Sequence, residues 1–151
     1  MQNMSPKTRI APKRSKMSSE ASKRKKKPIP LPKQLEALQK QICLKMYGND
    51  CYTCAAKNLQ GKNCHLGHVP WPRSILATPC KYDLRFVRPQ CMVCNVHHGG
   101  MGGAAALRMQ SEGVDLDALW QENESLKGIT YGDKWFKEQI PLYEAKLALM
   151  K

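Results

Sequence analysis

The sequence predicts a small α+β domain that is anchored by four cysteine ligands of a zinc ion and preceded by a disordered basic arm. Three observations lead to this prediction. Cysteines occur in two C-x-x-C pairs, apolar residues repeat with helix or strand periodicity around them, and basic residues crowd the N-terminus. The chain has 151 residues, which suits one domain with a tail, and only 7% of them are aromatic. We therefore expect a small core.

The N-terminal arm carries most of the charge. Residues 1–27 contain ten basic residues and one acid, so they supply +9 of the formal net charge of +13. This segment has no aromatic residue and cannot bury enough apolar surface to offset its loss of conformational entropy. We predict a disordered basic arm over residues 1–30 and one folded domain over residues 31–151. The arm includes a run of five basic residues: Lys23, Arg24, Lys25, Lys26 and Lys27. Such a run is typical of phosphate binding, and a solvated tail or a localisation signal is the alternative.

The two C-x-x-C pairs predict a structural zinc site. They are Cys51 with Cys54 and Cys91 with Cys94. Two short turns can aim four thiolates at one point, and four is the number that a tetrahedral structural zinc ion requires. The odd total of seven cysteines and the lack of a signal-peptide pattern argue against a disulfide framework, and redox chemistry by either pair is the alternative. We expect the three remaining cysteines to be buried in apolar surroundings. These are Cys43, Cys64 and Cys80.

The elements before the second pair follow from periodicity and from the residues that end each pattern. Residues 33–47 predict a helix with one apolar face, and Gly48 is a suitable stop. The residues of that face are Leu35, Leu38, Ile42 and Met46. Residues 59–69 predict a strand or hairpin arm, and residues 83–88 alternate and predict a second strand. A proline-rich loop at residues 70–73 follows the first strand.

Flanking helices are predicted after the second pair. Residues 104–111 and 114–126 form two of them, and a third begins at Asp133, which is a good N-cap. Pro141 is expected to kink this last helix. Its inward residues are predicted to be Trp135, Ile140, Tyr143, Leu147 and Met150.

All four histidines of the chain gather around the cysteine pairs. They are His65, His68, His97 and His98. Asn95 directly follows Cys94, which places it in the first turn of a helix that leaves the second pair. Residues 65 and 68 can share one face of a strand only if the strand bends, and Gly67 allows such a bend. Imidazole and amide groups at these positions suit divalent ion binding and proton transfer.

These motifs resemble those of zinc-anchored HNH (ββα-metal) nucleases, above all the lambda NinG/Rap recombination family. The resemblance covers about residues 46–151. It rests on the first C-x-x-C pair, Gly67-His68, Leu84-Arg85-Phe86, the segment 90–98 and a tail of helices containing Trp and Tyr. The string from Val87 to Asn95 is also similar to T-even phage endonuclease VII. The resemblance implies a ββα-metal core in a metal-dependent endonuclease that cleaves branched DNA, such as Holliday junctions. It also implies a phage-encoded protein in the cytoplasm of a bacterial host cell.

The resemblance implies roles for individual residues. His68 matches the general base that takes a proton from the attacking water. Asn95 matches a ligand of a catalytic divalent ion, Mg²⁺ or Mn²⁺, which would stabilise charge on the leaving oxygen and the phosphate. His65, His97 and His98 are further candidates for contact with that ion. The alternatives are a zinc site of His65 with Cys64, an exposed His65, and a phosphate contact by His97 or His98.

Arginines are expected to bind the DNA phosphates. Arg85 or Arg88 would neutralise a non-bridging phosphate oxygen, by a bidentate contact where geometry permits. Arg73, Arg88 and the basic arm are expected to contact the DNA backbone.

The sequence departs from the usual HNH pattern at two places. Gly67 and His65 stand where a carboxylate is usual, and Asp83 is the candidate to supply the missing acid. Phe86 occupies the place of the central Asn, so another group must orient the base. Because imidazole is softer than carboxylate, His65 favours Mn²⁺, Ni²⁺ or Zn²⁺ over Mg²⁺.

Two other functions remain consistent with the sequence. One is an HNH nicking or homing-type endonuclease acting on duplex DNA, and the other is a non-catalytic zinc module that binds DNA through the arm. A homodimer is a further expectation, since a two-fold junction suits a two-fold enzyme. The chain has no apolar run near the ~20 residues needed to span a bilayer, so we expect neither a membrane protein nor a secreted one.

Overall fold

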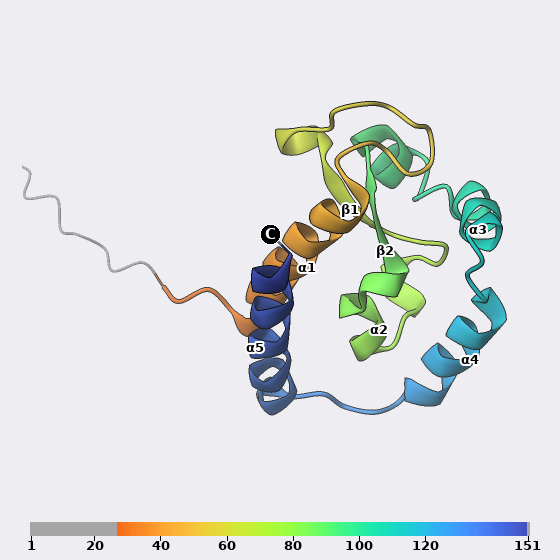
Figure 1. Ribbon diagram of the computed structural model, residues 1–151. Coiled ribbons are helices and arrows are strands. Elements are labelled where there is room, and N and C mark those ends of the chain that lie inside the picture. The colour runs from red at the N-terminus through yellow and green to blue at the C-terminus, as the bar shows by residue number, and fades with distance from the viewer. Residues whose placement is uncertain (1–26, 151) are drawn as a thin grey trace, which may run out of the picture.

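The computed structural model describes residues 27–150, which form an α+β fold with mostly helices and one two-stranded sheet. The predicted α+β class is confirmed. Figure 1 shows the hairpin at the centre, with helices α1 and α5 on one side and α3 and α4 on the other. The elements are α1 (Leu31–Tyr47), β1 (His65–His68), α2 (Thr78–Tyr82), β2 (Val87–Gln90), α3 (Gly102–Ser111), α4 (Leu116–Leu126) and α5 (Asp133–Leu149). Of the basic run, Lys27 is exposed, and Lys23, Arg24, Lys25 and Lys26 lie outside the described residues.

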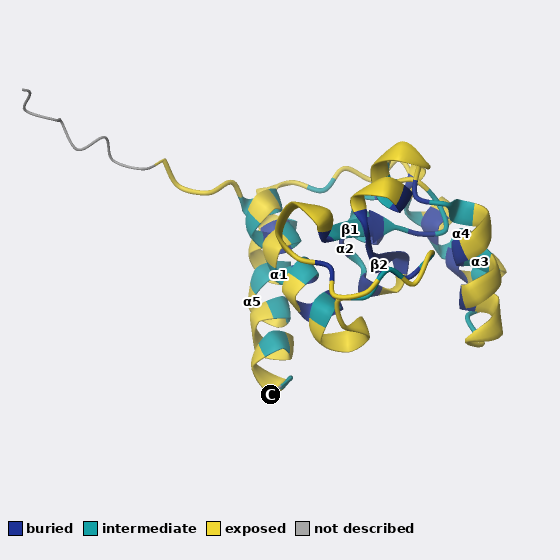
Figure 2. Ribbon diagram, turned by 90° about the horizontal axis from the view of Figure 1, so that it is seen from above, coloured by how far each residue is buried: buried dark blue, intermediate teal, exposed yellow. Residues whose placement is uncertain are grey.

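Helices α1 and α5 lie side by side and run in parallel (Figures 1 and 2). Leu35 near the start of α1 packs with Phe136 near the start of α5. Further along, Ile42 packs in one cluster with Tyr143 and Leu147. The buried residues gather on the hairpin and on the helix faces turned toward it, as Figure 2 shows. Of the predicted inner face of α1, Met46 is the exception, because 42% of its surface is exposed.

Helix α1 ends where the sequence predicts, at Gly48, which has a φ of 75°. Its first turn contains a proline, which needs no backbone donor at that position. Helix α5 begins near the predicted place and continues through the exposed Pro141 to Leu149, but Asp133 is its first helical residue and not the predicted N-cap, which is Gly132. No helix in the described part of the chain is long and apolar enough to cross a membrane.

The strand predicted over residues 83–88 is wrong in its first half. Residues 84–86 form a 3₁₀ turn, and β2 begins only at Val87. The reason is local: the Asp83 side chain accepts a hydrogen bond from the backbone N–H of Arg85 at 2.8 Å, which caps the turn. Strands β1 and β2 then pair antiparallel, with His65 opposite Gln90.

A second core lies between the hairpin and helices α2, α3 and α4. Its buried members include Val69, Phe86 and Met109. Helix α2 was not predicted. Buried Asn123 on α4 holds its start, because the Asn123 Oδ1 atom accepts from the backbone N–H of Ala77 at 2.7 Å. The proline-rich loop is therefore tied to the same core that supports β1.

Candidate metal centre and hairpin hollow

Four cysteines converge as the spacing predicts. They are Cys51, Cys54, Cys91 and Cys94, and their sulfur atoms all lie within 4.8 Å of one another. The Sγ atoms of Cys54 and Cys91 are 3.8 Å apart. A tetrahedral zinc ion with bonds of ~2.3 Å needs sulfur atoms about 3.8 Å apart. This cysteine cluster could therefore hold a metal ion such as zinc.

Backbone amides of the two turns point at the sulfur atoms. The N–H of Cys91 donates to the Cys51 Sγ atom at 3.3 Å, and the N–H of Cys94 donates to the Cys91 Sγ atom at 3.4 Å. Burial raises the pKa of the Cys51 thiol, but hydrogen bonds from Thr53 and from backbone amides outweigh it and lower that pKa to about 6. This shift favours the thiolate at Cys51, which is the form that binds metal, whereas burial raises the pKa of Cys94 to about 12.

The other three cysteines are buried, as predicted. They are Cys43, Cys64 and Cys80, and none belongs to the metal-binding group found among the described residues. Burial raises the pKa of Cys43 to about 12 and that of Cys80 to about 11. Cys64 packs against the cysteine cluster together with Leu59. These thiols serve as core residues.

His68 ends strand β1 and is held in one orientation. Its Nε2 atom lies 2.8 Å from the backbone oxygen of Lys81. A carbonyl can only accept, so Nε2 carries the hydrogen and Nδ1 keeps its lone pair in the neutral ring. Burial lowers the pKa of His68, with a further lowering by the charge of Arg73. The ring can therefore accept a proton at neutral pH.

Helix α1 fixes the carbonyl that orients His68. The buried Gln39 donates from Nε2 to the same Lys81 oxygen at 3.2 Å and to the Asp83 oxygen at 3.4 Å. Phe86, at the place of the usual central Asn, is fully buried in the core instead. The sequence shows that another group has to orient the base, but no pattern points to a backbone carbonyl at the end of a short helix.

His65 and Asn95 are in contact with each other. The Nε2 atom of His65 donates to the backbone oxygen of Lys62 at 2.9 Å. Its Nδ1 atom therefore keeps a lone pair, and it lies 3.1 Å from the Asn95 side-chain amide. Asn95 lies in a π-helical turn, Val93–His97, that directly follows β2 and the first cysteine of the second pair. The cysteine cluster and this contact thus share one short segment.

A hollow of about 390 Å³ opens beside His68. We call it the hairpin hollow, and it is lined by Leu66, His68, Pro72, Arg73, Asn95, Gly99 and Gly100. The structure thereby brings together three residues that the sequence singles out: His68, Asn95 and Arg73. The Arg73 Nη2 atom pairs with the Glu36 Oε1 atom of α1 at 2.5 Å. No sequence motif points to Glu36, because it lies 32 positions before His68 on a separate helix.

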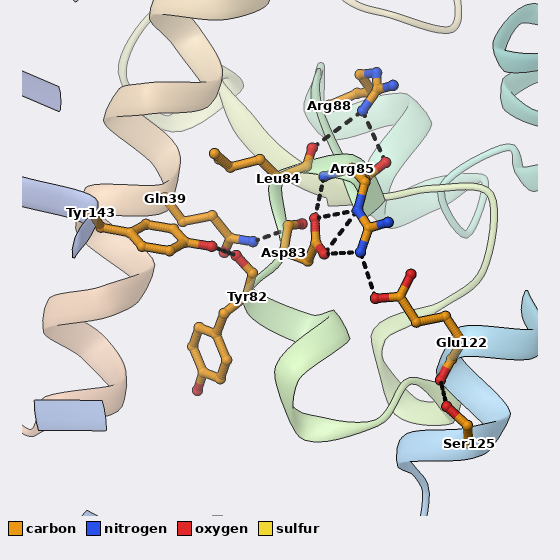
Figure 3. Close-up of polar contacts among 9 residues, drawn as sticks. All are labelled: Gln39, Tyr82, Asp83, Leu84, Arg85, Arg88, Glu122, Ser125 and Tyr143. Carbon is orange, nitrogen blue, oxygen red and sulfur yellow. Dashed lines mark hydrogen bonds and ion pairs between the residues drawn. The ribbon is translucent and has the colours of Figure 1, made fainter. Parts of the chain in front are cut away.

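Other predicted residues do not line the hairpin hollow. One is His65: β1 pairs regularly along its length, so His65 and His68 point to opposite faces and the bend expected at Gly67 does not bring them together. His97 and His98 are exposed at the end of the π-helical turn. Arg85 is held by Asp83 and by Glu122, each at 2.7 Å from its Nη2 atom (Figure 3). Asp83, the candidate for the missing acid, is thus already paired.

Arg88 is buried on the other face of the hairpin from His68. Only 3% of its surface is exposed, and its Nη1 atom donates to the carbonyls of Val87 and Arg85 (Figure 3 shows the latter). Its guanidinium lies 4.3 Å from the centroid of the Tyr47 ring. It pairs across the hairpin with Gly67, one position from the His68 pair, so the two side chains point to opposite faces. The structure gives Arg88 a packing role.

Packing disfavours a side chain at Gly67, where the resemblance leads us to expect a carboxylate. A Cβ atom at Gly67 would lie 1.9 Å from the Oε1 atom of buried Gln90. The Nε2 atom of Gln90 donates to the backbone oxygen of Gly100 at 2.7 Å, so Gln90 cannot move without loss of that bond. Any acid of the hairpin hollow must therefore come from another element.

Comparisons with protein families, with curated proteins and with solved structures find no match to this chain.

Proposed function

We propose that this protein is a metal-dependent DNA endonuclease of the HNH type that cleaves branched DNA. The observation that carries the proposal is the state of His68. The residue is half-buried and neutral, is fixed through Nε2 by the Lys81 carbonyl, and lines a hollow together with Asn95 and Arg73. A general base requires this combination of a free ring nitrogen, a fixed orientation and a pKa below neutral pH.

In this proposal the Nδ1 atom of His68 takes a proton from a water molecule. The water oxygen forms a bond to phosphorus, the bond from phosphorus to the 3′ oxygen breaks, and the leaving oxygen takes a proton from solvent. The products are a 5′-phosphate and a 3′-hydroxyl. A divalent ion, when bound, would stabilise the negative charge on the phosphate and the leaving oxygen.

The donor set beside the hollow fits such an ion. Asn95 offers its amide oxygen after rotation about the side chain, and His65 offers Nδ1. The Asn95 Nδ2 atom now lies 3.1 Å from His65 Nδ1, so an exchange of the amide nitrogen and oxygen would bring Oδ1 close enough to Nδ1 for both to bind one ion. The bond from His65 Nε2 to a backbone carbonyl is the support that ligating histidines usually have. We expect Mn²⁺ to serve better than Mg²⁺ at this pair, since one donor is an imidazole.

The cysteine cluster has a structural role in the proposal. A zinc ion there would tie the first cysteine turn to the π-helical turn that carries Asn95. It would thereby hold Asn95 against the hairpin. All four positions are protein ligands, which is typical of structural rather than catalytic zinc.

The preference for branched DNA rests on the resemblance alone, and the charge distribution supports binding to DNA in general. The arm supplies +9 of the net charge and would give sequence-independent affinity through counterion release. Removal of residues 1–27 should therefore weaken DNA binding and flatten its salt dependence. The folded part should keep its preference for the junction, because it carries the cysteine and histidine motifs on which the resemblance rests.

The test compares a labelled four-way junction with a linear duplex of the same sequence, in Mg²⁺ and in Mn²⁺. We expect cleavage of the junction by the wild type, and a loss of about 10³-fold or more in His68→Ala. His97→Ala is the matched control, because His97 is exposed and outside the hollow. Equal cutting of both substrates would favour a nicking or homing-type enzyme. No cutting by the wild type in either metal would contradict the proposal and leave a binding module.

A further inference from the structure

We propose that Arg73 is a catalytic residue that binds the scissile phosphate, and that Glu36 positions it. This inference rests on the proposed nuclease function. It assigns to Arg73 the role that the sequence suggests for Arg85 or Arg88, and it adds a residue of α1 to the site.

Arg73 is the only charged side chain among those that line the hairpin hollow. It begins a 3₁₀ turn, Arg73–Ile75, directly after Pro72. Because His68 lines the same hollow, a phosphate that enters it meets one base and one cation. A guanidinium can donate two parallel hydrogen bonds to two oxygens of a phosphate.

The contacts of Arg73 use one nitrogen and leave the others available. Its Nη2 atom donates to Glu36 at 2.5 Å and to the Tyr82 hydroxyl at 3.4 Å. Its guanidinium carbon lies 5.2 Å from the centroid of the Tyr82 ring. The Nη1 and Nε atoms donate to no residue in the described part of the chain. The guanidinium is thus fixed at its Nη2 corner, and the three N–H groups on Nη1 and Nε are not used by Glu36 or Tyr82.

Glu36 is a positioning residue in this arrangement. It lies on α1, outside the hollow, and its side chain is the only carboxylate paired with Arg73 in the described part of the chain. One acid balances the charge of Arg73 in the free protein. A phosphate can then share the guanidinium with Glu36, because the free nitrogens lie away from the carboxylate contact.

Arg85 provides a natural comparison. It also pairs with a glutamate of a flanking helix, Glu122 of α4, at 2.7 Å. In addition, Asp83 accepts from both the Nε and Nη2 atoms of Arg85. Two carboxylates therefore occupy Arg85, and Arg85 does not line the hairpin hollow. Both are ion pairs between an arginine and a glutamate of a helix, but only Arg73 lines the same hollow as His68.

The test measures kcat and KM on junction DNA for matched variants. We expect Arg73→Gln to lower kcat by about 10²-fold, the usual effect of losing one donor to developing charge. Arg73→Lys should keep part of kcat, since an ammonium retains the charge without the planar fork. Added guanidinium ion should restore part of the activity of the Gln variant. Arg85→Gln should stay within about twofold of the wild type, as surface ion pairs contribute little.

The second pair of variants tests the positioning role. Glu36→Gln should lower kcat by about tenfold with little change in KM, because a misplaced cation stabilises the transition state less well. Glu122→Gln is its control and should leave both constants unchanged. Thermal melting shows whether each variant is folded. If Arg73→Gln is unfolded, the kcat of Arg73→Lys tests the role of Arg73 in its place.

The outcomes separate this inference from the proposed function. A wild type that cuts no DNA contradicts both. A wild type that cuts and depends on His68, with Arg73→Gln no more impaired than Arg85→Gln, contradicts the role of Arg73 alone. Equal effects of the two glutamate variants contradict the role of Glu36.

Discussion

The cysteine cluster and the hairpin hollow are built in different ways. The cluster takes its four ligands from two short turns, and backbone amides of the same turns support the sulfur atoms. The hollow depends on residues of α1, β1, the proline-rich loop and the π-helical turn, with a backbone carbonyl as the key acceptor. The cluster therefore depends mainly on two short turns, and we propose that it holds the fold, whereas the hollow needs several elements to be packed together. Each of the following predictions separates the two regions.

The largest expected effect is on the fold. Cys91→Ser removes one ligand of the cluster, and structural zinc contributes about 10 kcal/mol or more to the folding of small domains. We expect loss of bound zinc and loss of cooperative unfolding in circular dichroism. Cys64→Ala is the control: it is buried beside the cluster but is not a ligand, so it should cost about 1–2 kcal/mol and keep the metal. A Cys91→Ser protein that melts like the wild type would show that the cluster does not hold the fold.

The second largest effect is expected on the concentration of divalent ion that cleavage requires, in variants whose fold is intact. Asn95→Ala removes one of the two donor atoms, so we expect the Mn²⁺ concentration for half-maximal cleavage to rise by about 10–100-fold. His65→Asp replaces the imidazole by a carboxylate and should shift the preference toward Mg²⁺. Melting temperature and zinc content are measured on the same samples. His98→Ala is the control, and a shift in its metal requirement equal to that of Asn95→Ala would contradict the assignment.

The two regions also differ in what the sequence reveals. The spacing of Cys51, Cys54, Cys91 and Cys94 predicts their convergence, because a C-x-x-C turn has nearly fixed geometry. The longer helices α1, α3, α4 and α5 are also predicted, since each presents a periodic apolar face, whereas the five-residue α2 is too short to show one. The strand over residues 83–88 is not, because alternation does not reveal that Asp83 caps a turn.

The site shows the same limit. His68 and Asn95 stand out as chemical groups in a motif, and Arg73 stands out only as one of several arginines. Glu36 and Gln39 reach the site through the packing of α1 against the hairpin, which a single sequence does not encode as a pattern. Arg85 and Arg88 follow the motif more closely than Arg73, yet one is held by two carboxylates and the other is buried.

A smaller effect is expected on the pH dependence of kcat/KM, through His68 in the hollow. Burial lowers the pKa of His68, the charges of Arg73 and Lys81 lower it further, and Glu36 and the Lys81 carbonyl oppose this. Because the folded state holds the neutral ring, the rising limb of kcat/KM should have its midpoint below the ordinary pKa of about 6.5. The same shift makes the free energy of unfolding fall as pH drops through that range, since the unfolded state binds the extra proton. An NMR titration of His68, assigned with His68→Gln, checks the direction. A midpoint above 6.5 would contradict the neutral base.

The smallest effect is expected from Gln39, whose action on His68 is indirect. Gln39→Leu removes the bond that fixes the Lys81 carbonyl, so His68 should lose some of its orientation and kcat should fall by about 3–10-fold, a cost of about 1 kcal/mol. Stability should change little, because the Gln39 Oε1 atom is buried without a partner and leucine removes that unsatisfied group.

Asn123 makes this prediction sharp, because it is the counterpart of Gln39 at the other end of α2. Asn123 is also a buried amide with one unsatisfied atom. It accepts one hydrogen bond from the Ala77 N–H at the start of α2, whereas Gln39 donates to two carbonyls at the other end. Asn123→Leu should therefore resemble Gln39→Leu in stability and leave kcat near the wild-type value. If both variants lowered kcat equally, the loss would come from a general loosening of α2. If kcat fell only in Gln39→Leu, then the orientation of His68 would depend on the Lys81 carbonyl. That carbonyl is fixed by Gln39 of α1, a helix outside the HNH motif.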